Sequence, residues 1–230
     1  TPFRARMVAW KGKRLAVAKD FTDNGEMTPA AVRDGAVCLD EATASRMAGE
    51  LLSAAFKVVS METKPYRRRP LPPFTTSTLQ QAAGNRLSMS SRQTMRAAQG
   101  LYENGFITYM RTDSVTLSGE AITAARKAVQ RDFGEEFLSD SPKQYATTAA
   151  GAQEAHECIR PAGASFREPS ELASLVAPDQ LRLYTLIWRR TLASQMADAT
   201  GSTATVRLSA TAGADGETTF QASGTVIEFP

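Results

Sequence analysis

The spacing of apolar residues changes twice along this chain, and these two changes constrain its fold more than any other feature. Before about residue 60, segments such as FRARMVAW and KRLAVAKDF are typical of strands, whereas beyond about residue 75 apolar residues recur at helical spacing. From Gly201 the segment STATVRLSA alternates again, as a half-buried strand does. The sequence therefore predicts a multidomain α+β fold, with a β-rich domain split between residues 1–67 and 197–230 and an inserted, mainly helical domain at residues 68–196.

The first boundary lies in the segment KPYRRRPLPPF, where four prolines interrupt any regular element. A chain of 230 residues is long enough for one large or two modest domains. It begins without Met and ends just after the strand-like run TVIEF, so we expect it to be a piece of a longer protein.

Local patterns predict four further elements in the β-rich parts. A hairpin turns at Lys11-Gly12, and a helix runs from Glu41 to Ala55 with Asp40 as its N-cap. FKVVSME is predicted to be a strand, and a turn at Ala214-Asp215-Gly216 leads into a last strand, TTFQASG.

Two short helices open the helical part. The first is predicted over residues 75–83, ends at Gly84, and begins with hydroxyl residues three positions before glutamines, the capping pairs Ser77–Gln80 and Thr78–Gln81. The second begins near Ser90, with Gln93 as its capping partner, and ends at Asn104-Gly105. Its inward face is expected to carry Met95, Ala98, Leu101 and Tyr102.

A short strand, FITYMR, is predicted directly after these two helices, which gives the outline of a helix-turn-helix with a wing. Further helices are expected from Ser118 to Asp132 and from Pro178 to Met196. The last of them would pack one apolar stripe into the core, formed by Leu181, Tyr184, Ile187, Trp188 and Leu192.

The composition is that of a globular protein, with 42% hydrophobic and 22% charged residues. No apolar run approaches the roughly 18–20 residues that a membrane-spanning helix needs, so we expect no membrane contact. The two cysteines, Cys38 and Cys158, predict neither a zinc site nor a disulfide framework, which fits a reducing cytoplasm.

Positive charge is concentrated between Thr63 and Arg111, where eight basic residues stand against one acidic residue although the net charge is only +3. Such a block indicates a polyanionic partner, most simply a nucleic acid. The alternative is a solvated linker followed by an exposed helix face.

Two residues are candidates for chemistry. The single histidine, His156, lies in AHECIRP, where Arg160 occupies the position that a second zinc ligand would need. Tyr109 lies in FITYMR, and if this segment is extended, Ile107, Tyr109 and Arg111 share one face. A guanidinium beside a phenol, whose ordinary pKa is about 10, favours the phenolate and binds phosphate oxygens, as transesterification of a phosphodiester requires. The alternative is a structural tyrosine with an ion pair between Arg111 and Asp113.

Four segments together resemble bacterial type IA DNA topoisomerase I, with an actinobacterial style in the flanks. They are PPFTTSTLQQAA, LYENGFITYMRTDS, QEAHECIRP and LYTLIWRRTLASQM, in this order between Lys64 and Ala197. The chain departs from the family pattern at Cys158, where alanine is common. The β-rich flanks would correspond to the arch of that family.

The resemblance implies specific roles for these residues. Tyr109 would attack single-stranded DNA to form a 5′-phosphotyrosine, Arg111 would bind the transferring phosphate, and His156 would lie near the scissile bond with Asp113 as an orienting residue. Rejoining conserves the bond energy, so negative supercoils are relaxed without ATP, and the chain has no P-loop. We expect contacts to DNA from Arg86, Arg92, Arg96 and Arg160.

The family's Mg²⁺ ligands belong to an upstream acidic domain with a DxD motif, and this chain contains no such motif. We therefore expect no metal ligand here, an inactive fragment, and a dependence on the N-terminal magnesium-binding domain of the same polypeptide. The partner would be single-stranded or negatively supercoiled DNA, and the protein would be a cytoplasmic, nucleoid-associated monomer.

Three other classes of protein are alternatives to a type IA topoisomerase. A tyrosine recombinase is rejected, because its tyrosine follows an HxxR cluster whereas Tyr109 precedes His156 and the spacing here is HxxxR. A non-catalytic winged-helix module would bind DNA through its arginines and use Tyr109 only for packing. A protein-interaction domain would bind its partner without a steep dependence on salt.

Overall fold

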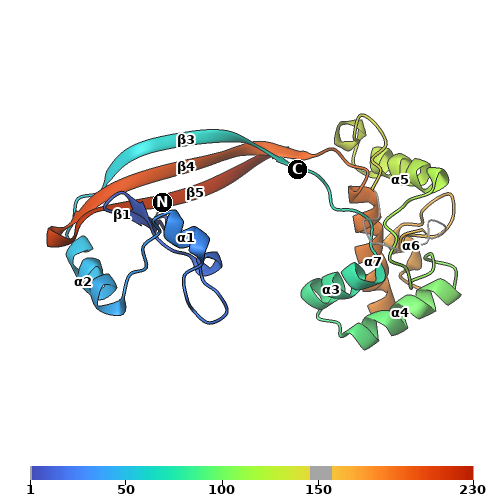
Figure 1. Ribbon diagram of the computed structural model, residues 1–230. Helices are drawn as coiled ribbons and strands as arrows, with labels where there is room; N and C mark the ends of the chain where they lie inside the picture. The colour runs from blue at the N-terminus through green and yellow to red at the C-terminus, as the bar shows by residue number, and fades with distance from the viewer. Residues whose placement is uncertain (1, 146–156, 230) are drawn as a thin grey trace. The chain divides into compact units, whose positions relative to one another are not determined.

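The computed structural model describes residues 2–145 and 157–229 and shows a mixed α/β fold (Figure 1). The chain divides into two compact units. Unit 1 comprises Thr1–Arg67 and Thr200–Pro230, and unit 2 comprises Arg68–Ala199.

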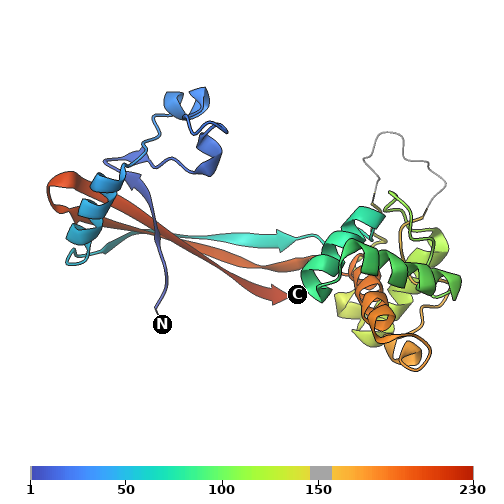
Figure 2. The ribbon, with the colours of Figure 1, turned by 90° about the horizontal axis from the view of Figure 1, so that it is seen from below.

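Unit 1 is built on one five-stranded sheet with the order β2-β1-β5-β4-β3. The β1–β2 hairpin turns at Lys11-Gly12, as predicted, where both residues have positive φ, 50° and 73°. Figure 2 shows β3, β4 and β5 as long, twisted ribbons. The strands are β1 (Arg6–Trp10), β2 (Lys13–Arg14), β3 (Lys57–Arg68), β4 (Ala199–Ala212) and β5 (Gly216–Phe229).

The described residues of unit 1 also form two α-helices, α1 (Pro29–Arg33) and α2 (Glu41–Leu51). Asp40 caps α2 as predicted, because its carboxylate accepts a hydrogen bond from the amide of Thr43 at 2.7 Å. The helix ends at Leu51, four residues before the predicted end. The strand predicted from FKVVSME is longer than expected and continues through Pro65 to Arg68.

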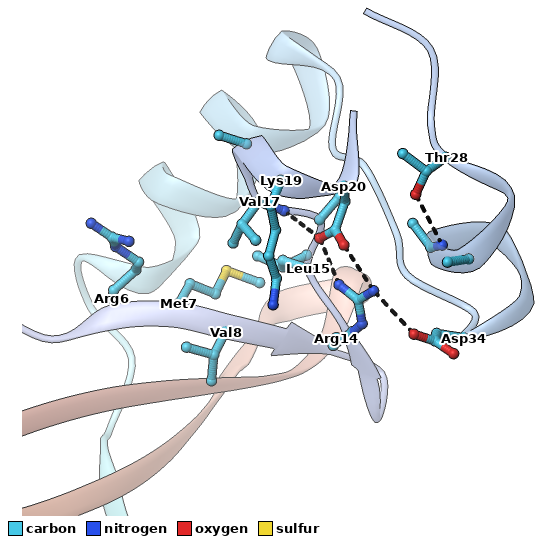
Figure 3. Close-up of a pocket in the computed structure, with 14 residues that line it drawn as sticks. Arg6, Met7, Val8, Arg14, Leu15, Val17, Lys19, Asp20, Thr28 and Asp34 are labelled. Carbon is cyan, nitrogen blue, oxygen red and sulfur yellow. Dashed lines mark hydrogen bonds and ion pairs between the residues drawn. The ribbon is translucent and has the colours of Figure 1, made fainter. Parts of the chain in front are cut away.

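A buried carboxylate organises the pocket in unit 1 that Figure 3 shows. Asp20 is only 5% exposed, and it accepts two hydrogen bonds from the Arg14 guanidinium, at 2.7 and 3.0 Å, and one from the Val17 amide at 2.9 Å. The hydrogen bonds from Arg14, then that from Val17, lower the pKa of Asp20 to about 2.

Because this pKa lies below its ordinary value, ionised Asp20 stabilises the fold above about pH 4, and that stabilisation is lost as the pH falls through about 2. We expect Asp20→Asn to lower the unfolding temperature of the 230-residue chain at pH 7 and to lose most of this effect by pH 2. Circular dichroism melts between pH 2 and 7 measure the difference. A difference independent of pH would contradict a role for the ionised carboxylate.

Unit 2 packs its helices around α7, which contacts α3, α4, α5 and α6. Tyr184, Ile187, Trp188 and Leu192 of the predicted stripe are buried, and Leu181 is partly buried against the same core. No helix in residues 2–145 and 157–229 is long and apolar enough to cross a membrane. The helices are α3 (Thr76–Leu87), α4 (Ser91–Glu103), α5 (Gly119–Asp132), α6 (Pro169–Leu172) and α7 (Pro178–Ala193).

The structure corrects the prediction for α3. The N-cap is Thr75, whose capping partner is Thr78, and the helix continues through Gly84 to Leu87, where Ser88 ends it in a left-handed conformation with φ 56°. A glycine inside a helix costs only about 1 kcal/mol relative to alanine, so the buried contacts of this helix outweigh the stop signal. For α4 the predicted cap is correct, since Ser90 and Gln93 form a capping box.

The strand predicted from FITYMR is wrong. In the part of the chain that the structure describes, this segment forms only an isolated bridge between Ile107 and Pro161, so the predicted wing is not found there. Its backbone is instead hydrogen-bonded to Thr76 and Arg160, which are distant in sequence.

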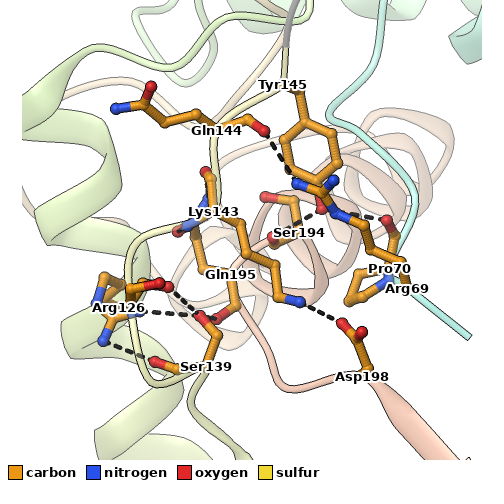
Figure 4. A network of polar contacts seen from close by, with 11 residues as sticks. Arg69, Pro70, Arg126, Ser139, Lys143, Gln144, Tyr145, Ser194, Gln195 and Asp198 are labelled. Carbon is orange, nitrogen blue, oxygen red and sulfur yellow. Dashed lines mark hydrogen bonds and ion pairs between the residues drawn. The ribbon is translucent and has the colours of Figure 1, made fainter. Parts of the chain in front are cut away.

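A polar network fastens the two ends of unit 2 to each other (Figure 4). The Tyr145 hydroxyl lies 3.1 Å from the carbonyl oxygen of Pro70 and 3.0 Å from that of Ser194. Arg69 lies over the Tyr145 ring and donates to the Gln144 carbonyl, and Lys143 forms an ion pair with Asp198. The entry and exit of unit 2 are therefore held side by side.

Candidate active site

Three segments named in the sequence analysis come together in unit 2. The backbone amide of Ile159 donates to the Phe74 carbonyl at 2.8 Å, which joins ECIRP to PPFTT. The amide of Thr108 donates to the Arg160 carbonyl at 2.9 Å, which joins FITYMR to the same segment. The tyrosine-bearing segment is thus held by contacts between residues far apart in sequence.

Thr76, the first residue of α3, fixes the backbone on both sides of Arg111. Its hydroxyl donates to the Met110 carbonyl at 2.7 Å and accepts from the Thr112 amide at 2.9 Å, and its own amide donates to the Thr112 carbonyl at 2.9 Å. A side chain and a helix N-terminus together position this loop.

We expect Thr76→Val to lower the free energy of unfolding of the 230-residue chain by about 1–3 kcal/mol, because valine fills the space but leaves the Met110 carbonyl and the Thr112 amide without that partner. Denaturant unfolding measures the change. Thr76→Ser keeps the hydroxyl and is the matched control. If the valine and serine variants are equally stable, the hydroxyl is not what holds the loop.

Tyr109 projects from this fixed backbone into solvent. Its side chain is 45% exposed, whereas Met110 is 1% and Ile107 is 2% exposed, and Arg111 is exposed. Tyr109 and Arg111 are therefore both accessible, whereas Ile107, which was predicted to share their face, is buried. The alternative of a structural ion pair is not supported, since no ion pair joins Arg111 to Asp113 in the described part of the chain.

Tyr102 does not lie where its position on α4 predicts. It was expected on the inward face of α4, but it is 41% exposed and its ring lies edge-on to that of Tyr109, with centroids 5.3 Å apart and planes at 65°. Such a pair contributes about 0.5–1.5 kcal/mol beyond burial, so Tyr102 restricts one side of the Tyr109 ring. The Asn104-Gly105 turn, visible in the sequence, is what brings the two tyrosines together.

Arg160 was expected to contact DNA, and the structure gives it a different place. It is 7% exposed, and its guanidinium donates to Glu157 at 2.6 Å and to the Pro161 carbonyl at 2.9 Å. Glu157 also accepts from the Ser118 amide at 2.9 Å, which ties this segment to α5. Burial raises the pKa of Glu157, but hydrogen bonds from Ser118 and Arg160 outweigh it and hold that pKa below its ordinary value. The donors of Arg160 are thus directed at protein groups.

The remaining residues named for the site or the family pattern differ in how exposed they are. His156 lies outside the described residues. Cys158 is fully buried, and burial raises the pKa of its thiol to about 12. Four expected site residues are exposed, namely Arg86 on α3, Arg92 and Arg96 on α4, and Asp113 after the tyrosine segment.

Among residues 2–145 and 157–229, no three His, Cys, Asp or Glu side chains are grouped so as to hold a metal ion. These residues therefore do not fit a magnesium site.

Comparisons with known proteins agree with the arrangement of these segments. A family model described as DNA topoisomerase matches residues 15–230. The chain is 49% identical over 228 residues to DNA topoisomerase 1 of Mycolicibacterium smegmatis, and 50% identical over 230 residues to that of Synechocystis. These alignments cover 99% and 100% of this chain but 24% of each relative, so the chain spans about a quarter of their length.

A solved structure, full-length topoisomerase I from Thermotoga maritima, matches 99% of this chain and 35% of its own chain, with a TM-score of 0.66 and 30% identity. The mixed fold with its curled antiparallel sheet is therefore that of a topoisomerase I. Because the family model covers nearly the whole sequence, this chain belongs to the bacterial DNA topoisomerase family, which confirms the resemblance.

Proposed function

We propose that this chain is the nucleophile-bearing part of a type IA DNA topoisomerase, which cuts and reseals one strand of DNA through Tyr109. The observation that carries the proposal is an exposed tyrosine on a loop fixed by Thr76 and by the Cys158–Ala162 segment, with an exposed arginine two residues away. The names of the relatives support DNA as the partner.

The proposed chemistry balances without an external energy source. The Tyr109 Oη attacks the phosphorus of a phosphodiester, and its proton leaves. The O–P bond to tyrosine forms as the bond from phosphorus to O3′ breaks, and the departing O3′ takes up a proton. Rejoining reverses these steps, so the number of phosphoester bonds is unchanged and ATP is not needed.

Arg111 would donate to the phosphate oxygens, where negative charge grows during transfer. Asp113 would orient neighbouring groups, and His156, outside the described residues, would act near the scissile bond. Arg160 would position the loop through Glu157. The DNA backbone would be contacted by the exposed arginines of α3 and α4, which are Arg86, Arg92 and Arg96.

The remaining assignments belong to the whole protein. Unit 1 would be a split arch domain, and unit 2 would be the tyrosine domain inserted into it. Both would work with a magnesium-binding domain elsewhere in the same polypeptide. The whole protein would be a nucleoid-associated monomer in the bacterial cytoplasm. The α3–α4 pair would be a helix-turn-helix element. The 230-residue chain alone is expected to bind single-stranded DNA weakly and to relax no plasmid. Relaxation by the chain alone would contradict this division of the active site.

The decisive experiment uses the longest natural protein that contains this chain. It is incubated with magnesium and a single-stranded oligonucleotide labelled at either end, and covalent products are separated on denaturing gels and mapped by mass spectrometry. An adduct on Tyr109 through the 5′ side of the break is the expected result. Salt-sensitive binding without an adduct would leave a non-catalytic DNA-binding module, and binding insensitive to salt would indicate a protein-interaction domain.

A further inference from the structure

Arg190, on α7, is a cation anchored at the surface of unit 2. Its guanidinium carbon lies 4.2 Å from the centroid of the Phe74 ring, and its Nη1 donates to the Pro72 carbonyl at 3.2 Å. Both partners belong to the segment that leads into α3. The guanidinium is therefore held in one place by an aromatic face and one hydrogen bond.

No carboxylate neutralises this cation in the part of the chain that the structure describes. The nearby charge is instead positive. Burial, and then the charge of Arg86, lower the pKa of Arg190. Bringing two guanidinium groups together without an acid raises the free energy of the folded protein, and a bound anion would remove that cost.

The remaining donors of Arg190 are open. Its Nε and Nη2 have no hydrogen-bond partner among the described residues, and neither is among the buried polar atoms that lack one, so both reach solvent. The Nε–H and Nη2–H groups lie on one edge of the planar guanidinium, and two parallel N–H groups of this kind match two oxygens of a phosphate. Arg86 is exposed at the last turn of α3 and can supply a second contact.

We propose that Arg190 and Arg86 form a phosphodiester-binding site for the backbone of single-stranded DNA, in addition to the Tyr109–Arg111 site. The proposal rests on the proposed function for its choice of DNA. Arg190 lies far in sequence from the basic block between Thr63 and Arg111. It reaches this block only because α7 packs against the segment that contains Phe74. Free inorganic phosphate presents the same oxygens as the DNA backbone, and the experiment distinguishes these two ligands.

The test measures binding without chemistry, so it is independent of whether an adduct forms. The longest natural protein carrying Tyr109→Phe is titrated with a fluorescent oligo-dT at salt concentrations from about 50 to 200 mM. We expect Arg190→Gln and Arg86→Gln each to raise Kd about 5- to 20-fold and to reduce the slope of log K against log salt by roughly 0.7, the change for one lost phosphate contact on a single strand. Arg189→Gln is the matched control, an exposed arginine adjacent on α7, and should change Kd less than about 2-fold.

One further variant and a competitor separate the remaining outcomes. Arg190→Lys keeps the charge but not the fork, so it should fall between the parent and Arg190→Gln. Arg86→Gln alters an exposed side chain and keeps the test valid if Arg190→Gln unfolds. The proposal is overturned if Kd and the salt slope are unchanged in Arg86→Gln and in a folded Arg190 variant. It is also overturned if these variants lose no more affinity than Arg189→Gln does. Inorganic phosphate could also compete with the oligonucleotide more strongly than its ionic strength explains. If this competition disappears in Arg190→Gln, the site binds free phosphate and the DNA assignment is wrong.

Discussion

Replacing Tyr109 by phenylalanine is expected to reduce covalent adduct formation by the full-length protein at least about 10³-fold, while Kd for single-stranded DNA changes less than about 2-fold. The substitution removes only the hydroxyl oxygen that we propose to attack the phosphodiester. The phenylalanine ring can keep the edge-on contact with Tyr102, and the buried neighbours Ile107 and Met110 are untouched. Single-turnover cleavage of a labelled oligonucleotide, with anisotropy for binding, measures both quantities.

Tyr102→Phe is the matched control for this variant. Tyr102 is an exposed tyrosine in contact with Tyr109, at 41% against 45% exposure, and it carries the same nucleophilic group. Loss of its hydroxyl should leave the adduct intact. An adduct that persists in Tyr109→Phe and disappears in Tyr102→Phe would assign the nucleophile to Tyr102 and contradict the proposed function.

Arg111→Gln is expected to slow adduct formation about 10²- to 10³-fold, with similar decreases in kcat and kcat/KM. An interaction that strengthens as charge develops on the transferring phosphate is lost in both parameters, whereas a uniform binding contact is lost in KM alone. Arg111 is exposed, and no described residue forms an ion pair with it, so its guanidinium is available to a phosphate. Single-turnover and steady-state rates on the same oligonucleotide give both numbers.

Arg92→Gln removes an exposed arginine from α4 and should change the rate less than about 3-fold at saturating DNA. Arg111→Lys restores charge without the fork and should recover part of the rate. A rise in KM with kcat unchanged in Arg111→Gln would show that Arg111 only holds DNA, and its role in transition-state stabilisation would be wrong.

Local signals were sufficient at the N-termini of α2 and α4, whereas α3 begins with Thr75 and Thr78 and not with the predicted capping pairs. The Ser90–Gln93 box and the Asp40 cap lie within one turn of backbone, so the sequence carries all the groups that make them. The end of α3 was predicted wrongly because buried contacts, which depend on distant residues, outweigh the cost of Gly84.

The tyrosine segment shows why a site is harder to predict than a helix. Alternation in FITYMR indicated a strand, yet its backbone bonds go to Thr76 and to the Cys158–Ala162 segment, which no local pattern specifies. Arg190 likewise takes its position from Phe74 and Pro72, which are distant from it in sequence. Motif order identified the family and the proposed nucleophile, whereas the residues that hold it required the fold.

The contacts that join the two ends of unit 2 have an entropic consequence. Tyr145 contacts the carbonyls of Pro70 and Ser194, which lie near the first and the last residues of the unit. Bringing the two ends of a long segment together costs loop-closure entropy, and this cost rises only slowly with the length of the segment. Residues of unit 2 supply the contacts that keep this loop closed, so the unit fixes its own ends.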